Sequence, residues 1–210
     1  MLNIIIADDH PLIREGFKRI LHEEPDLHVQ GEASSGDELF QLVRGHRPDM
    51  VILDLTMPGK HGLDIIKELK LEFPSLPVLI VSMHPEDRFA VRAIRLGASA
   101  YLTKDSAPYE LVKAIRKVIG GERYITPSVG AQLARAVGGS GKQSAHESLS
   151  NREMQVLCLL ASGKSTNEIA KDLCISINTV NTYRTRILEK LNLKSNVDLT
   201  LYAVRNKLIE

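Results

Sequence analysis

The first 120 residues alternate between two hydrophobic patterns. Amphipathic helices are predicted where apolar residues recur every three or four positions, and they begin near Pro11, Gly36, Gly62, Glu86 and Pro108. Before each helix lies a short apolar run, and such runs predict strands buried on both faces. The five predicted strands are Leu2–Ala7, Val29–Ala33, Met50–Leu53, Pro77–Val81 and Ala100–Thr103. Strands that alternate with helices five times predict an α/β domain, doubly wound around a five-stranded parallel sheet.

Beyond Gly120 and Gly121 the pattern changes to helices alone. Residues 126–137 keep an i, i+4 apolar spacing that predicts a short helix, and residues 138–144 form a flexible Gly/Ser-rich segment. Four further helices, each preceded by a Ser, Thr or Asn cap, are predicted at about 151–161, 166–173, 177–191 and 196–206. We therefore predict an α/β domain at 1–121, a linker at 122–147 with a short helix, and a small all-α domain at 148–210.

The composition excludes several classes of protein. Apolar residues make up 43% and charged residues 25% of the 210 residues, so two domains can build cores without disulfides or metals. No apolar run approaches the ~20 residues of a membrane span, and the first residues lead directly into a strand, so we expect no membrane segment and no signal peptide. Cys158 and Cys174 fall on predicted apolar helix faces. Buried free thiols in a reducing cytoplasm are expected there, and a redox or metal role is the alternative.

Charge is divided unevenly between the two predicted domains. Residues 1–125 carry a net charge of −3, and residues 148–210 carry a net charge of +3. A mildly basic small domain is compatible with nucleic acid binding, although this charge alone is weak support for it.

A lone carboxylate follows the most apolar of the predicted strands. Asp54 comes directly after Met50–Leu53, at the carboxyl end of the strand, where open α/β sheets bind their ligands. Because all parallel strands end at one edge of the sheet, the polar residues that follow the other strands should gather beside Asp54. These residues are Asp8, Asp9, Ser82 and Lys104.

Three converging carboxylates repel one another unless a cation neutralises them, and Mg²⁺ with oxygen ligands is the typical cation. Lys104 adds a fixed positive charge, and the Ser82 hydroxyl can donate to a phosphoryl oxygen. This set is what phosphoryl transfer to an aspartate requires, so we predict that Asp54 is a phosphate acceptor. Each residue alone could be an ordinary surface charge at a strand end.

These motifs resemble the receiver domain of bacterial two-component response regulators, whose fold is flavodoxin-like. The resemblance spans residues 1 to about 120 and rests on Asp8-Asp9, on Leu53 to Gly59 around Asp54, on Ser82, and on Lys104 after Gly97-Ala98. It implies that a sensor histidine kinase phosphorylates Asp54. It also implies that Asp9, Asp54 and the Thr56 carbonyl ligate Mg²⁺, while Asp8 acts through water.

The resemblance further implies a switch pair made of Ser82 and Tyr101. The hydroxyl would move to the phosphoryl group and the ring would turn inward behind it; plain core filling is the alternative for Tyr101. Thr56 and His84 would tune the lifetime of the acyl phosphate, although His84 could be an ordinary loop residue. The helix from Glu86 would form the output face, with three arginines available for pairing: Arg88, Arg92 and Arg95.

A second motif lies in the all-α half. The helix at 168–173, the turn Cys174-Ile175-Ser176 and the helix from Ile177 form a helix-turn-helix pattern. The last helix has a buried stripe made of Val180, Ile187, Leu188 and Leu191. Its other positions are rich in short polar and guanidinium groups, which suit base edges and phosphates in a major groove, and a solvated polar face is the alternative. The candidate contacts to double-stranded DNA are Thr179, Asn181, Thr182, Tyr183, Arg184, Thr185 and Arg186.

The stretch from Leu149 to Leu191 resembles the LuxR-type helix-turn-helix of NarL/FixJ-family regulators. Asn181 and Tyr183 depart from the lysine and histidine common at these positions, which implies a variant half-site. By the same resemblance, the helix from Asn196 would pair two DNA-binding domains as a homodimer, and packing within the domain is the alternative.

Together the two motifs predict a DNA-binding response regulator and not an enzyme, with phosphorylation of Asp54 controlling dimerisation and operator binding. Two rival functions are weighed against it. An atypical regulator would keep the acidic site as a relic, which the complete acidic set argues against. A phosphohydrolase of the haloacid-dehalogenase type would require an aspartate where Thr56 stands.

Overall fold

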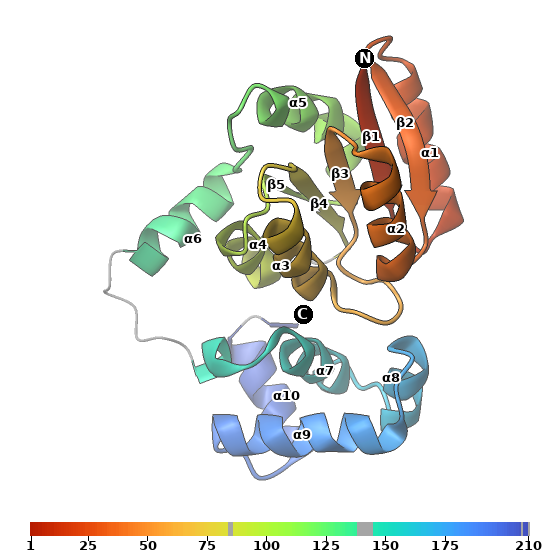
Figure 1. The fold of residues 1–210 in the computed structure, drawn as a ribbon. Helices are drawn as coiled ribbons and strands as arrows, with labels where there is room; N and C mark the ends of the chain where they lie inside the picture. Colours follow the sequence, from red (N-terminus) through yellow and green to blue (C-terminus); the bar gives the residue numbers. More distant parts are fainter. Residues whose placement is uncertain (84–85, 138–144, 207, 210) are drawn as a thin grey trace. The chain divides into compact units, whose positions relative to one another are not determined.

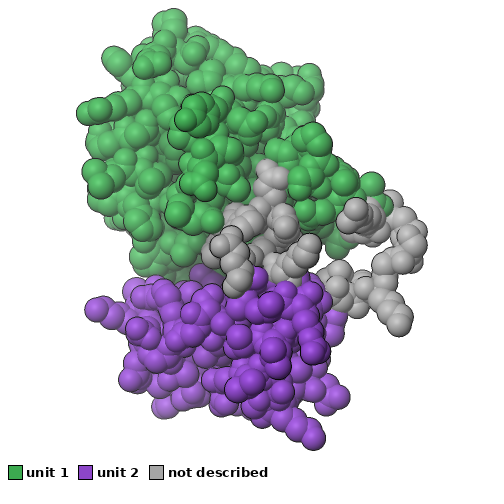
Figure 2. Space-filling model, turned by 180° about the vertical axis from the view of Figure 1, so that it is seen from behind, with its two compact units in different colours: residues 1–137 green, residues 138–210 purple. Residues whose placement is uncertain are grey.

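The computed structural model describes residues 1–83, 86–137, 145–206, 208 and 209. The chain divides into two compact units, Met1–Val137 and Gly138–Glu210 (Figure 2). In the described part, no helix is long and apolar enough to span a membrane.

The first unit is built on a five-stranded sheet in which every neighbouring pair is parallel (Figure 1). The strands are β1 (Leu2–Ala7), β2 (Leu27–Ala33), β3 (Met50–Leu53), β4 (Val78–Ser82) and β5 (Ala100–Thr103). Their order is β2-β1-β3-β4-β5. The chain moves outward from β1 to β2 and then returns past β1 to β3, so the order reverses between β1 and β3. That reversal opens a ligand position at the carboxyl ends of these two strands.

Helices cover both faces of this sheet, which confirms the predicted doubly wound α/β fold. They are α1 (Pro11–His22), α2 (Gly36–His46), α3 (Gly62–Glu72), α4 (Glu86–Arg95) and α5 (Ala107–Ile119). Alternate residues of each strand point to opposite faces, and Ile4, Ile6 and Ile52 pack with residues of α1 and α5. Because both faces are buried, these strands read as continuous apolar runs.

Residues 122–137 extend the first unit beyond the predicted boundary at 121. Tyr124 forms a parallel bridge with Ala100 of β5, and its backbone N–H donates to the Ser99 carbonyl at 3.0 Å. The helix predicted at 126–137 is present as α6 (Pro127–Val137), which packs on α4 within the same unit. Burial of Tyr124 and Val129 explains why this segment joins the first unit, whereas the sequence pattern assigned it to the linker. The Gly/Ser-rich residues 138–144 lie outside the described residues.

The second unit consists of short helices in the predicted order. They are the 3₁₀ turn η1 (Ala145–Ser148) and the helices α7 (Asn151–Ala161), α8 (Thr166–Asp172), α9 (Ile177–Leu191) and α10 (Asn196–Arg205). Serine hydroxyls cap the four α-helices by accepting a backbone N–H of the first turn, from Ser150, Ser165, Ser176 and Ser195.

The two cysteines differ in environment. Cys158 is buried on α7, as predicted, but Cys174 is exposed, so its predicted burial is wrong. Helix α8 ends at Asp172, and Cys174 lies beyond it in the turn with a φ of 52°. A turn residue in this left-handed conformation does not continue the apolar face of the preceding helix.

Gly62 allows the loop after Asp54 to fold back tightly onto the start of α3. A Cβ atom at Gly62 would lie 2.5 Å from the Leu55 Cα and 3.0 Å from the Asp54 carbonyl oxygen. Both are backbone atoms, which cannot move as a flexible side chain can. Close packing therefore requires glycine at this position. Backbone conformation does not, because the φ of Gly62 is outside the left-handed region.

We predict that Gly62→Ala lowers the free energy of unfolding by about 1–3 kcal/mol, the usual cost of forcing atoms into a packed site. The matched control is Gly16→Ala on the exposed side of α1, where a Cβ meets nothing within 4 Å. This control should stabilise the protein by roughly 0.5–1 kcal/mol, because alanine loses less backbone entropy in a helix. Urea unfolding of both variants measures the difference, and effects of the same sign would contradict the prediction.

Candidate functional site

The sheet brings the polar residues that follow its strands to one edge. The Asp54 backbone N–H donates to the Ala7 carbonyl at 2.8 Å, and the Lys104 N–H donates to the Ser82 carbonyl at 2.9 Å. These bonds continue the parallel ladder one residue past the strand ends, so the side chains start from fixed positions at the switch point. The predicted convergence of Asp8, Asp54 and Lys104 is thus observed.

Lys104 joins the two buried carboxylates. Its Nζ lies 2.7 Å from Asp8 Oδ2 and 2.9 Å from Asp54 Oδ2, and all three residues are less than one-tenth exposed. Burial raises the pKa of Asp54, the nearby Asp8 charge raises it further, and the Lys104 ammonium acts in the opposite direction. Burial lowers the pKa of Lys104, but the two carboxylates outweigh it and raise this pKa above its usual value.

The acidic group offers several ligand atoms for a cation. One ligand atom each from Asp8, Asp9, His10 and Asp54 lies within 4.8 Å of the others. Asp54 is 2% exposed, and its Oδ1 accepts no hydrogen bond from the described residues. Three carboxylates against one lysine also leave an excess negative charge when all are ionised. Oxygen donors, an unsatisfied buried oxygen and negative charge fit a hard divalent cation such as Mg²⁺.

Three further predicted site residues belong to β4, to β5 and to the segment after β3. Ser82 is fully buried at the end of β4, and Thr56, two residues beyond Asp54, is half-buried with a backbone N–H that donates to the Asp54 carboxylate. Tyr101 on β5 is 1% exposed, and its role in a switch pair stays a prediction. His84 and the side chain of Arg88 lie outside the described residues.

Two histidines near the site were not identified as site residues from the sequence. His61 is buried, and its Nδ1 accepts the Leu63 backbone N–H at 3.1 Å, so the ring caps α3. His10 contacts the acidic pair directly, with Nδ1 2.8 Å from Asp9 Oδ1. Hydrophobic periodicity carries no signal for either role, although the position of His10 immediately after Asp8-Asp9 could have indicated it.

The predicted DNA-contact residues on α9 separate into two groups. Asn181, Thr182, Thr185 and Arg186 are exposed, and their helical spacing places them on one face together with Asn178, which the sequence analysis did not include. The other three are half-buried: Thr179, Tyr183 and Arg184.

The half-buried group is partly committed to contacts within the unit. Thr179 Oγ1 lies 2.8 Å from the Ser176 hydroxyl at the start of the helix. Arg184 donates through Nε to Asn196 Oδ1 at 2.6 Å, which links α9 to the first residue of α10. The exposed group therefore has the more accessible polar surface.

An ion pair between the exposed Lys190 side chain and the buried Glu153 carboxylate links α9 to α7. Lys190 lies 2.6 Å from the Glu153 carboxylate, which also accepts the Ser150 backbone N–H in the capping box of α7. Burial acts to raise the pKa of Glu153, but the Lys190 ammonium and the Ser150 donors outweigh it, so this pKa lies below its usual value. Val180, Ile187 and Leu191 are buried on the same side of α9, and only Leu188 of the predicted stripe is half-exposed.

Helix α10 has one buried and one exposed apolar face. Leu199 and Ala203 are fully buried in the unit, whereas Val197, Leu201 and Val204 are 50–68% exposed. The helix therefore packs within its own unit and also presents an apolar surface.

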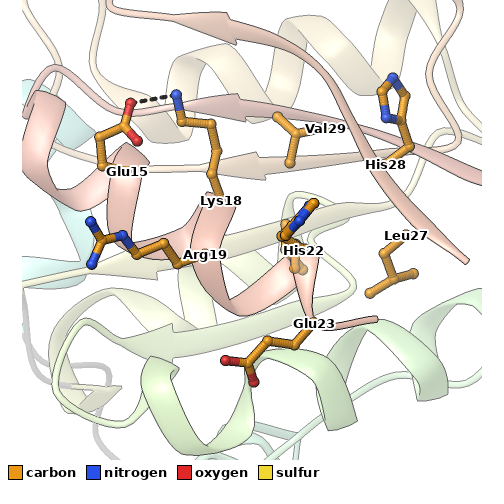
Figure 3. A pocket seen from close by; sticks show the side chains of 9 residues that line it. Glu15, Lys18, Arg19, His22, Glu23, Leu27, His28 and Val29 are labelled. Carbon is orange, nitrogen blue, oxygen red and sulfur yellow. Dashed lines mark ion pairs between the residues drawn. The ribbon is translucent and has the colours of Figure 1, made fainter. Parts of the chain in front are cut away.

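A pocket of about 660 Å³ opens between α1 and β2, away from the acidic group (Figure 3). It is lined by the end of α1 and the start of β2, including His22, Leu27 and His28. It therefore lies toward the amino ends of the strands, opposite the edge where Asp54 stands, and it contributes nothing to the acidic site.

Comparison with known proteins agrees with both sites. A model described as the response regulator receiver domain matches residues 4–116, and one described as bacterial regulatory proteins, luxR family, matches residues 147–203. The chain is 39% identical to the response regulator GacA of Pseudomonas aeruginosa, across 100% of this chain and 99% of that protein. It is 36% identical to the response regulator UvrY of Escherichia coli, across 99% of this chain and 96% of that protein. The chain belongs to the NarL/FixJ family of bacterial response regulators.

Solved structures agree with this membership. RcsB from Salmonella enterica serovar Typhimurium, bound to promoter rprA in the presence of phosphomimetic BeF₃⁻, matches with a TM-score of 0.66 and 28% identity, across 97% of this chain and 99% of that one. A further RcsB–DNA complex matches with a TM-score of 0.60 and 29% identity, across 97% of this chain and 98% of that one. Family membership confirms the predicted fold and the prediction of a regulator and not an enzyme.

We predict that Lys104→Met lowers the free energy of unfolding of this response regulator by about 3–5 kcal/mol, because it leaves two buried carboxylates without their cation. Lys60→Met is the control, since Lys60 pairs with Glu68 at 2.7 Å but both side chains are exposed, and its effect should stay below about 1 kcal/mol. Urea unfolding of the full chain measures both effects, and equal losses would show that the Lys104 bridge is not stabilising. Millimolar Mg²⁺ should restore part of the stability lost in Lys104→Met.

Proposed function

We propose that a sensor histidine kinase phosphorylates this response regulator on Asp54 in the cytoplasm, and that phosphorylation promotes a homodimer which binds double-stranded DNA. The observation that carries this proposal is the state of the Asp54 carboxylate. Oδ2 is held by Lys104 at 2.9 Å, whereas Oδ1 is buried without a hydrogen bond among the described residues. Oδ1 is therefore the oxygen available for attack.

The reaction exchanges one bond for another. A bond forms between Asp54 Oδ1 and the phosphorus atom while the bond from phosphorus to the kinase imidazole nitrogen breaks, so no oxidant or further reactant is required. In this proposal Lys104 and the Ser82 hydroxyl interact with the phosphoryl oxygens, which carry the charge in the transition state. Asp9, Asp54 and the Thr56 carbonyl would hold Mg²⁺, with Asp8 acting through water. When bound, this ion neutralises charge on the phosphoryl oxygens.

The output part of the proposal rests on α9 and α10. RcsB, a response regulator whose structure matches 97% of this chain, has been solved bound to DNA. In this chain, Asn178, Asn181, Thr182, Thr185 and Arg186 form the exposed polar face suited to a major groove. The exposed apolar side chains of α10, Val197, Leu201 and Val204, supply a surface on which two copies can pair.

We predict that acetyl phosphate with Mg²⁺ phosphorylates the wild-type protein and raises both its dimer fraction and its affinity for operator DNA, whereas Asp54→Asn responds in neither assay. Asp37→Asn makes the same chemical change at an exposed position in the first turn of α2 and should behave as wild type. Phosphate-affinity gels, sedimentation velocity and DNA-binding titrations measure the three steps. An Asp54→Asn protein that still gains DNA affinity with acetyl phosphate would contradict the Asp54 switch. A wild-type protein that acetyl phosphate with Mg²⁺ does not label would favour the atypical regulator.

Leu201→Asp separates dimerisation from phosphorylation in the same assays. The introduced carboxylate disrupts the exposed apolar face of α10 but leaves the buried Leu199 unchanged. This variant should be phosphorylated normally and remain monomeric.

We also predict that Arg186→Ala weakens DNA binding by about 1–3 kcal/mol. If Arg186 contacts a phosphate, the magnitude of the slope of log affinity against log salt concentration falls by roughly one, the contribution of one released ion. If Arg186 contacts a base edge, the variant loses discrimination between operator sequences. Arg19→Ala removes the same charge from an exposed position of α1 and serves as the control. Equal affinities of Arg186→Ala and Arg19→Ala in fluorescence anisotropy titrations would exclude the assigned face of α9.

A further inference from the structure

His10 occupies an unusual position at the acidic group. It is the N-cap residue of α1, but its side chain makes no capping hydrogen bond. Its Nδ1 lies 2.8 Å from Asp9 Oδ1 and 3.2 Å from Asp8 Oδ1, and its backbone N–H donates to the same Asp8 oxygen at 2.8 Å. The backbone and the ring together direct His10 toward the acidic pair and not toward the helix.

These distances match a coordination sphere. Adjacent ligands of an octahedral ion with bonds of about 2.1 Å lie about 3.0 Å apart, between the two observed Nδ1–oxygen distances. An ionised carboxylate only accepts hydrogen bonds, so the contact of Nδ1 with these oxygens is a hydrogen bond when Nδ1 carries the ring hydrogen. A divalent ion at this position would replace that hydrogen, as metal binding to imidazole does generally.

An independent observation indicates that a ligand belongs in this position. Asp54 is 98% buried, and its Oδ1 has no hydrogen-bond partner among the described residues. One carboxylate oxygen of Asp54 belongs to the group of ligand atoms within 4.8 Å that includes His10. The His10 side chain is 60% exposed, so the ring lies at the solvent side of the site and an ion can enter past it. Lys104 closes the opposite side through its contacts with Asp8 and Asp54.

We propose that His10 is an additional ligand of the cation site and gives it a preference for first-row transition-metal ions such as Mn²⁺ and Co²⁺ over Mg²⁺. Mg²⁺ binds carboxylate, carbonyl and water oxygens, whereas imidazole nitrogen favours transition metals, whose affinities for nitrogen donors rise from Mn²⁺ toward Cu²⁺. Three carboxylates alone would leave the site selective for hard ions. The inference rests on the proposed cation site, and it concerns which ion that site prefers.

The test compares His10→Ala with His28→Ala in the full-length protein without a histidine tag. His28 is an exposed histidine of β2 outside the acidic group, so it controls for the loss of an imidazole. Isothermal titration with Mg²⁺ and with Co²⁺ gives the ratio of the two affinities. We expect His10→Ala to lose about ten-fold or more of the Co²⁺ affinity, to keep its Mg²⁺ affinity within about three-fold, and His28→Ala to match wild type.

A spectroscopic measurement separates direct ligation from a change in charge. Electron spin-echo modulation of bound Mn²⁺ should show a directly coordinated nitrogen in wild type and in His28→Ala, and none in His10→Ala. An unchanged affinity ratio, or a spectrum without coordinated nitrogen in wild type, would overturn the role of His10 while leaving the Mg²⁺ site intact. Absence of Mg²⁺ and Co²⁺ binding in wild type would overturn the cation site itself, and with it that part of the proposed function.

Discussion

The Lys104 ammonium between Asp8 and Asp54 is the interaction on which the first unit depends. Two carboxylates that are almost fully buried would otherwise repel each other and lose the solvation that keeps them charged. With Lys104 within 2.9 Å of both, they remain at the sheet edge and face the same small volume. This contact engages one oxygen of Asp54, and the other accepts no hydrogen bond from the part of the chain that the structure describes.

A single lysine does not balance the charge of the whole acidic group. Asp9 and His10 lie next to the buried pair, and the imidazole of His10 supplies a second set of contacts to the carboxylates. A cation or a phosphoryl group that enters this site changes the net charge that these contacts surround. Such a site can respond to a change in charge without large rearrangement of the sheet, which suits a reversible regulator.

The second unit uses the same physical principle for a structural purpose. The Glu153 carboxylate is buried, and it is satisfied by the Ser150 donors and by Lys190 from α9. This pair fixes the side of α9 that carries Val180 and Ile187 against the unit, and it thereby leaves the opposite polar side exposed. This ion pair at one end of the helix and the apolar stripe along it together orient the exposed polar face of α9.

Much of the fold followed from the sequence because its causes are local or follow from general topology. The hydrophobic period predicted each α-helix and strand. Parallel strands necessarily end at one edge of the sheet, so the sequence also predicted that the residues after the strands gather there: Asp8, Asp54, Ser82 and Lys104. The structure placed β2 two residues earlier than predicted and added the bridge between Ala100 and Tyr124. Short apolar or polar segments at strand ends carry too little periodicity to predict such details.

Only the tertiary structure decided how side chains from distant elements meet. The sequence placed Arg184 on the DNA-contact helix, but its hydrogen bond to Asn196 depends on the path of α10. It placed 126–137 in a helix, but burial against α4 joined that helix to the first unit. It also gave no orientation for His10, whose ring lies against the acidic pair. Periodicity constrains which face of an element is apolar, whereas these contacts depend on distances between elements that are remote in the chain.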